Sequence, residues 1–128
     1  SDLIIMNGKE ACLITGEKDV ESAIKELKKY GAKIVIITQD VKGSLIAENG
    51  EIIRVPSYNV KVVDTTGGGD SYTAGFVHAK FRGYSTEDAV KFAGAVAALN
   101  ISTPGASTDL PTEKDVIEFM KTAEYLKA

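Results

Sequence analysis

The chain has 128 residues, with 44% hydrophobic and 26% charged residues, which is the composition of one globular domain, expected here over residues 1–128. The formal net charge is −3 and the lysines are dispersed, so the basic face that is typical of nucleic-acid binders is absent. No apolar run approaches the roughly 20 residues that a membrane span needs, and the single cysteine, Cys12, excludes an internal disulfide framework. We expect a cytoplasmic protein that binds neither nucleic acid nor membranes, with Cys12 as a small core residue.

The first elements form a predicted β-α-β unit. Residues 3–6 are a short apolar run, typical of a buried strand that ends at Asn7. Residues 19–30 carry apolar side chains at helical spacing, and Asp19 can cap the start of that helix. Residues 34–37 are all β-branched, which is typical of a strand covered on both faces in a parallel sheet. Strand, helix and strand in this order predict a right-handed crossover.

A β-hairpin and an extended segment are predicted next. Residues 44–47 and 51–55 have strand character and are separated by Glu48-Asn49-Gly50. Asn-Gly is a strong hairpin signal because both residues tolerate the backbone angles that a tight turn requires. Residues 60–63 are expected to be extended and to lead into a glycine-rich segment.

Three helices are predicted over the remainder of the chain. The first runs from about Asp70 to residue 82, and three small residues in it allow close packing: Ala74, Gly75 and Ala79. Ser85 begins the second helix with a cap and an acidic first turn, and an alanine-rich face makes this helix slim. Residues 112–115 resemble a capping box that opens the last helix. The predicted fold class is therefore α/β.

The chain begins almost directly with a strand of the buried type. A parallel strand needs neighbours and helices that cover both faces, yet only a few strands are visible in the sequence. We therefore expect this chain to be the C-terminal part of a longer protein.

Three successive glycines, residues 67–69, precede a predicted helix. Glycine lets a ligand approach the backbone closely, and several N–H groups at a helix N-terminus can converge on an anion. No Gly-Lys-Ser/Thr follows, which excludes a Walker A loop, and the third glycine of the dinucleotide fingerprint is missing. The glycines alone leave two interpretations open, a phosphate site and a tight turn before a helix.

Asp70 follows these glycines at the expected start of the helix. A carboxylate beside an anion site is electrostatically unfavourable unless it has a chemical role, and this one could take the proton of an attacking hydroxyl. The alternative is an acidic residue favoured by the helix dipole. His78, further along the same helix, is interpreted as a packing or surface residue.

Residues 64–76 closely resemble the C-terminal signature of the ribokinase-like (PfkB) carbohydrate kinases. Residues 7–10 resemble the family's Asn-x-x-Glu motif, residues 38–43 its turn against the nucleotide, and residues 100–105 its closing segment. The resemblance spans essentially the whole chain but only the C-terminal part of a usual family member. It implies the C-terminal part of a ribokinase-like, three-layer α/β/α fold, without the half that supplies the lid and most sugar contacts.

The resemblance also implies ATP-dependent phosphoryl transfer to a hydroxyl of a sugar or related small molecule, with Asp70 as the base. The remaining roles that it implies are an anion hole at Gly67, Gly68 and Gly69, nucleotide binding at Asn7, Thr38, Gly43, Gly69 and Asn100, a water-mediated Mg²⁺ site at Asn7 and Glu10, and, as in many members, a monovalent-cation site for K⁺ at Asp64, Thr66 and Gly105.

Two positions depart from the family pattern. Gly68 stands where alanine is usual, and Asp40 stands where the turn normally has glycine, which puts the nucleotide contact and preference in question. The alternatives left open are a nucleoside or sugar-phosphate acceptor, and a non-catalytic nucleotide-binding module. A homodimer of the full-length protein is also left open. The 128-residue chain alone is expected to be inactive or nearly so, because it has no recognisable lid.

Overall fold

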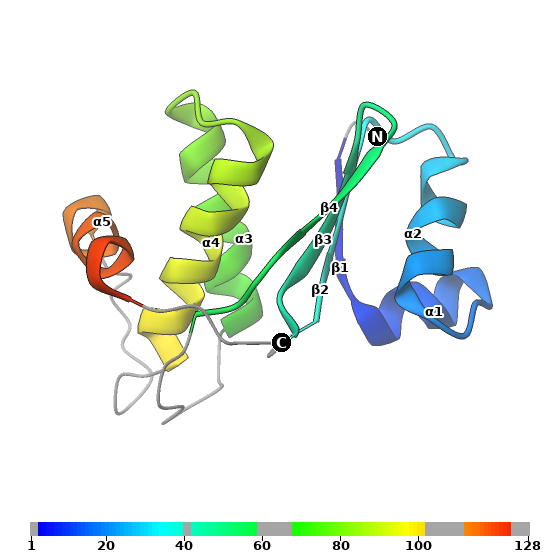
Figure 1. The fold of residues 1–128 in the computed structure, drawn as a ribbon, viewed down its shortest axis with the longest axis horizontal. Helices are drawn as coiled ribbons and strands as arrows, with labels where there is room; N and C mark the ends of the chain where they lie inside the picture. Colours follow the sequence, from blue (N-terminus) through cyan, green and yellow to red (C-terminus); the bar gives the residue numbers. More distant parts are fainter. Residues whose placement is uncertain (1–2, 40–41, 59–67, 102–111, 124–128) are drawn as a thin grey trace. The chain divides into compact units, whose positions relative to one another are not determined.

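A computed structural model describes residues 3–39, 42–58, 68–101 and 112–123, which belong to two compact units, residues 1–57 and residues 58–127 (Figure 1). The extended segment predicted at residues 60–63 lies outside the described residues, as does Asp40. Within the described ranges, none of the helices combines the length and the hydrophobicity that a membrane span requires.

The first unit is a mixed four-stranded sheet with two helices on one face (Figure 1). The strands occur in the spatial order β1-β2-β3-β4, where β1 and β2 are parallel and the other neighbours are antiparallel. The β-α-β unit and the hairpin are thus confirmed. The elements are β1 (Leu3–Asn7), α1 (Gly8–Thr15), α2 (Val20–Lys28), β2 (Ile34–Thr38), β3 (Ser44–Glu48) and β4 (Glu51–Val55).

Helix α1 is an element that the sequence analysis did not predict. A reciprocal capping box sets its start: the Glu10 N–H donates to Asn7 Oδ1 at 2.8 Å, and the Asn7 N–H donates to Glu10 Oε1 at 3.0 Å. Gly16 ends the helix in the left-handed conformation, with φ of 75°. The Asn-x-x-Glu pattern, interpreted from the sequence only as a family motif, is therefore also a helix-start signal.

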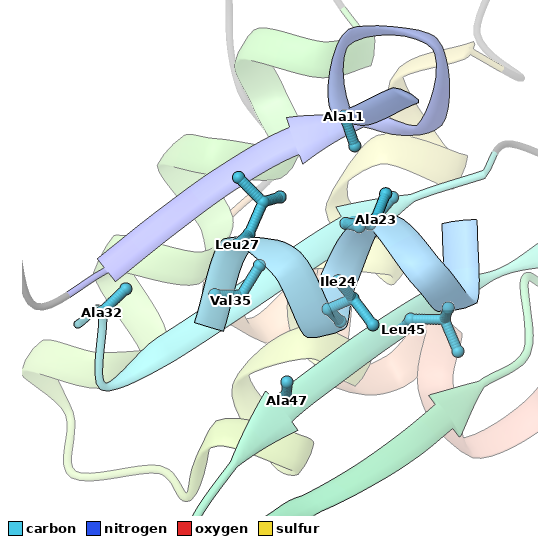
Figure 2. Close-up of a cluster of buried hydrophobic side chains, with 9 residues drawn as sticks. Ala11, Ala23, Ile24, Leu27, Ala32, Val35, Leu45 and Ala47 are labelled. Atoms are coloured by element: carbon cyan, nitrogen blue, oxygen red, sulfur yellow. The ribbon is translucent and has the colours of Figure 1, made fainter. Parts of the chain in front are cut away.

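The core of the first unit lies between the helices and the sheet (Figure 2). Alternate residues of β2, Val35 and Ile37, and of β3 share one face with the apolar side of α2. Burial of each large aliphatic side chain contributes about 1.5–3 kcal/mol. Cys12 is half-buried and packs against this cluster, as expected of a small core residue. The buried members are Ala11, Ala23, Ile24, Leu27, Ala32, Val35, Ile37, Leu45 and Ala47.

The β3–β4 hairpin turns through Asn49 and Gly50, whose φ angles are 53° and 79°. Positive φ at both central residues is what a type I′ turn requires, and this turn matches the right-handed twist of the two strands. Glu48 pairs with Glu51 directly across the turn. The predicted hairpin is confirmed.

The second unit is helical and contains α3 (Gly68–Phe81), α4 (Thr86–Ile101) and α5 (Glu113–Thr122). Helix α3 approaches α4 closely at Gly75, where a Cβ would lie 2.9 Å from Val96 Cγ2. Gly75 and Ala79 are buried, as their predicted packing role requires. Ala74 is exposed, so the same prediction is wrong there: with 3.6 residues per turn, position 74 points away from the buried face.

The caps predicted for the last two helices are confirmed. Ser85 Oγ accepts the Asp88 N–H at 3.2 Å before α4. Thr112 and Asp115 form a reciprocal capping box at the start of α5, with bonds of 3.1 and 3.3 Å. The first helix begins at Gly68, two residues before the start predicted from the sequence.

His78 has the packing and surface role that was expected. Its ring stacks on Phe92, with centroids 5.7 Å apart. Its Nε2 lies 3.5 Å from a carboxylate oxygen of Glu113, which also pairs with Arg82 at 3.1 Å. These contacts join α3 to α4 and α5 inside the second unit.

Candidate functional site

The carboxyl edge of the parallel strand pair brings three of the predicted site residues together. Asn7 ends β1, Thr38 ends β2, and the two are register partners across the pair. Thr38 also pairs with Ser44 of β3, so Gly43, which precedes Ser44, lies at this edge as well. In α/β sheets, ligands bind outside the carboxyl ends of the strands.

Asn7 and Glu10 hold each other in place at this edge. Their capping box uses Asn7 Oδ1 and Glu10 Oε1, and it sets the orientation of both side chains on the first turn of α1. The second carboxylate oxygen of Glu10, and on Asn7 the remaining lone pair of Oδ1 and the NH₂ group, can then serve a ligand. Both side chains are exposed.

The turn after β2 is shaped by backbone bonds and by a glycine. The Gln39 N–H donates to the Gly43 carbonyl at 2.7 Å, and the Lys42 N–H donates to the Gln39 carbonyl at 3.0 Å. Gly43 has φ of 87°, and a Cβ there would collide with the Val55 carbonyl oxygen. The glycine is therefore needed for the turn to pack against the end of β4, whatever it does for a ligand.

A pocket of about 770 Å³ opens beside this edge, between the strand ends and the first turns of α1 and α2. Asn7 and Thr38 line it, whereas Glu10 and Gly43 are not among the lining residues. Four lining side chains are basic and two are acidic, a balance that suits an anionic ligand. These six side chains are Lys9, Lys18, Lys42, Arg54, Asp19 and Glu21.

Sequence reasoning missed these charged lining residues. Lys9 lies inside the Asn-x-x-Glu motif and Lys42 directly precedes Gly43, so their positions within the motifs were a signal that could have identified them. Lys18 and Arg54 carry no such local signal, because the fold alone brings them to the pocket.

Asp19 contributes a negative charge to the pocket lining. The pKa of its carboxyl lies below the ordinary value because the Ser22 backbone N–H and hydroxyl donate to the charged form, and Lys25 adds a favourable charge. The backbone bond measures 2.7 Å and makes Asp19 the N-cap of α2. The sequence predicted this cap but not its place beside the pocket.

The other predicted site residues belong to the second unit. Gly68, Gly69 and Asp70 form the first turn of α3, where backbone N–H groups have no acceptor further back in the helix. Asp70 is exposed, and apart from its chain neighbours and the adjoining backbone of α3, no described residue has a heavy atom within 4 Å of the position that a Cβ on Gly69 would take. An exposed aspartate at a helix start fits both interpretations of this residue, the base and the helix-dipole partner.

Asn100 is half-buried near the end of α4. Four predicted site residues, Asp64, Thr66, Gly67 and Gly105, lie outside the described residues. The described part of the chain has no group of three or more His, Cys, Asp or Glu residues arranged to hold a metal ion.

Comparison with known proteins identifies a family that matches most of the chain. The family described as pfkB family carbohydrate kinase matches residues 1–113. Ribokinase from Haemophilus influenzae is 32% identical over 127 residues, which cover 95% of this chain and 42% of that protein. Cytidine kinase from Thermococcus kodakarensis is 38% identical over 93 residues, which cover 70% of this chain and 33% of that protein.

Solved structures of ribokinases also match this chain, in both fold and sequence. Arabidopsis thaliana ribokinase complexed with ribose and ATP superposes with a TM-score of 0.82 at 34% identity, over 94% of this chain and 41% of that one. A putative Ribokinase II from E. coli in complex with ATP and Mg²⁺ gives a TM-score of 0.86 at 25% identity, over 94% of this chain and 39% of that one.

The chain spans about two-fifths of the length of the ribokinases that it matches. The α/β fold predicted from the sequence is confirmed as ribokinase-like, because ribokinase structures match 94% of this chain with TM-scores of 0.82 and 0.86. The chain therefore belongs to the pfkB family of carbohydrate kinases, which are phosphotransferases.

Proposed function

We propose that the protein, at its natural length, transfers a phosphoryl group from ATP to a hydroxyl of a sugar or related small molecule. The observation that carries this proposal is the carboxyl edge of the parallel pair, where Asn7, Thr38 and Gly43 meet beside a pocket with an excess of basic side chains. An anionic ligand such as a nucleoside triphosphate suits that edge and that charge.

ATP is the proposed donor and Mg²⁺ the proposed ion, since the similar ribokinase structures contain ATP and one of them also contains Mg²⁺. Asn7 and Glu10 supply hard oxygen donors of the kind that Mg²⁺ prefers. With one carboxylate in this pair, the ion would be held mainly through water and the ATP phosphates, and it would neutralise phosphate charge. K⁺ binding by Asp64, Thr66 and Gly105 remains a prediction from the sequence.

Asp70 is the proposed base. Its carboxylate would take the proton of the acceptor hydroxyl as that oxygen attacks the γ-phosphorus, and ADP would leave from the opposite side. The amides of Gly67, Gly68 and Gly69 would stabilise the charge on the transferred group. The first-turn position of Gly68 and Gly69 in α3 supports this role, because N–H groups there are free of helix bonding.

The proposed acceptor is a sugar, a sugar phosphate or a nucleoside. A nucleoside acceptor is favoured by the 38% identity to cytidine kinase, and a sugar acceptor by the identity to ribokinases. Turnover of the natural-length protein with a panel of sugars, sugar phosphates and nucleosides decides between them. ATP binding without ADP release on any acceptor would instead indicate a non-catalytic nucleotide-binding module.

The decisive variant is Asp70→Asn in the natural-length protein. Loss of a general base lowers kcat by about 10²- to 10⁴-fold, while the KM for ATP should change little. Asp88→Asn is the matched control, because Asp88 is also an exposed aspartate in the first turn of a helix, α4. Near-normal turnover of Asp70→Asn would exclude the base role and leave the helix-dipole interpretation. A cytoplasmic location stays a prediction, to be tested by cell fractionation.

A further inference from the structure

Arg54 connects three segments of the first unit. It lies on β4, and its Nη1 donates to Gln39 Oε1 at 3.2 Å and to the Lys42 carbonyl at 3.3 Å. Its Nη2 pairs with Glu21 Oε1, in the first turn of α2, at 3.0 Å. One guanidinium thus joins β4, the start of α2 and the turn that follows β2.

That turn forms part of the pocket rim. Gln39 and Lys42 both line the pocket, and two backbone hydrogen bonds close the turn, one from Gln39 to Gly43 and one from Lys42 to Gln39. Gly43 lets the turn lie against the end of β4, and Arg54 supplies the polar contacts that hold the turn from the same strand. The planar guanidinium offers several donors in a rigid fork, which a lysine cannot reproduce.

We propose that Arg54 is a positioning residue for the nucleotide: it holds Gln39 and Lys42 at the pocket and thereby sets the affinity for ATP. This inference rests on the proposed function, in which Thr38 and Gly43 border the nucleotide.

The competing role for Arg54 is direct contact with phosphate, since Arg54 itself lines the pocket. Two features favour positioning. The guanidinium already donates to three protein oxygens, and Glu21 at 3.0 Å counters its charge. Both side chains of that pair are about half exposed, so the contribution of the pair to global stability is small and its local effect can be measured separately.

The first test compares Arg54→Gln and Arg54→Lys in the natural-length protein. If Arg54 positions the turn, both variants raise the KM for ATP by about five- to tenfold, the loss expected for one ordinary net hydrogen bond, because Arg54 acts on ATP only through the turn. The KM for the acceptor and kcat stay within about twofold. If Arg54 acts as a cation on phosphate, Arg54→Lys keeps most of the affinity while Arg54→Gln loses it.

The second test compares Glu21→Gln with Asp19→Asn, because both residues are acidic and line the pocket, so loss of either charge favours an anion directly. Relative to Asp19→Asn, Glu21→Gln binds ATP more weakly if the ion pair holds Arg54 in place. It binds ATP more tightly than Asp19→Asn if Arg54 is a phosphate ligand, because an anion that competes for Arg54 is removed. Glu26→Gln is the matched control on the same helix: Glu26 pairs with Lys29 at 3.2 Å, does not line the pocket, and its loss should leave ATP affinity unchanged.

Binding of a fluorescent ATP analogue and thermal melting are measured for every variant. Weaker ATP binding in Arg54→Gln and Arg54→Lys, and in Glu21→Gln than in Asp19→Asn, with unchanged melting, supports positioning. Unchanged affinity in Arg54→Gln, or tighter binding in Glu21→Gln than in Asp19→Asn, overturns it while the proposed function stands. Absence of ATP binding by the unaltered protein overturns the proposed function and this inference with it. If Arg54→Gln does not fold, the sign of the Glu21→Gln effect relative to Asp19→Asn decides.

Discussion

Asp19 has two roles at one position, since it caps α2 and lines the pocket. The cap stabilises the charged form of the carboxyl through the Ser22 N–H, and the pKa is lowered for that reason. The short side chain of Asp19 suits it to cap the helix, and the same carboxylate places a negative charge beside a pocket whose other side chains favour anions.

The Asp19 cap should make stability depend on pH in the acid range. Since the folded-state pKa lies below the ordinary value of 3.8, the stabilisation is fully present above pH 3.8 and is lost as the pH falls through the lower folded pKa. Urea denaturation should show Asp19→Ala to be less stable than the unaltered protein at pH 7, with a smaller difference near about pH 3. Asp19→Asn, which keeps a capping oxygen, should lose less at pH 7. An equal difference at both pH values would contradict this account.

Single glycines in the helices show how local and tertiary preferences compete. At Gly75, α3 and α4 are so close that a Cβ would lie 2.9 Å from Val96 Cγ2 and 3.2 Å from Ala93 Cα. At Gly94 of α4, the nearest atoms to such a Cβ are ring carbons of Tyr58 at 3.9 Å, which is an ordinary contact. Alanine has the higher helix propensity at both positions, but only position 94 has room for its Cβ.

Gly75→Ala and Gly94→Ala should therefore have opposite effects on stability. Alanine favours a helix over glycine by about 1 kcal/mol, so Gly94→Ala should raise the free energy of unfolding. Overpacking costs about 1–3 kcal/mol, so Gly75→Ala should lower it. Thermal or urea unfolding measures both. Adding Val96→Ala to Gly75→Ala should recover part of the loss, and stabilisation by Gly75→Ala alone would show that the helices separate without cost.

The start of α1 is both a helix cap and a proposed Mg²⁺ site. Asn7 and Glu10 cap the helix reciprocally, and the same two residues are proposed to act on Mg²⁺. The capping role needs only a carbonyl-type oxygen at position 10, whereas the metal role needs a carboxylate. A substitution that removes the charge of Glu10 but keeps the shape of its side chain therefore separates the capping role from the metal role.

Glu10→Gln and Glu10→Ala should divide these roles. Glu10→Gln keeps the acceptor for the Asn7 N–H and should keep the melting temperature, but it should raise the Mg²⁺ concentration needed for half-maximal turnover. Glu10→Ala should change both, with a stability loss of about 1 kcal/mol. Turnover against Mg²⁺ concentration is the measurement, with melting as its control. An unchanged Mg²⁺ requirement in Glu10→Gln would limit Glu10 to its cap.

For the chain as a whole, the relevant comparison is length. The chain covers about 42% of a ribokinase of the same family. We propose that the 128-residue chain alone phosphorylates acceptors little or not at all, since the family resemblance places the lid and most sugar contacts in the other half. Turnover of this chain and of the natural-length protein on the same acceptor panel measures the difference. Robust phosphorylation by the short chain would overturn the proposal.

Much of the fold was predictable because it depends on signals within a few residues. The Asn49-Gly50 turn, the Asp19 cap and the Thr112 capping box each rest on contacts spanning three residues or fewer, and each was predicted correctly. Helix α1 was missed although its capping box is equally local, because the Asn7–Glu10 pattern was interpreted for its chemistry alone. The outward position of Ala74 was missed because small size does not say which way a helix face points.

The sequence by itself determined the local conformations and the family, since turns, caps and motif spacing are set by short-range geometry. Only the tertiary structure decided which distant residues share the pocket. Asn7 meets Thr38 through the register of two parallel strands, and Arg54 reaches Glu21 across 33 positions of the chain. The physical reason is that such neighbours depend on how α1 and α2 pack their apolar faces onto the sheet, and no short segment of sequence encodes that packing.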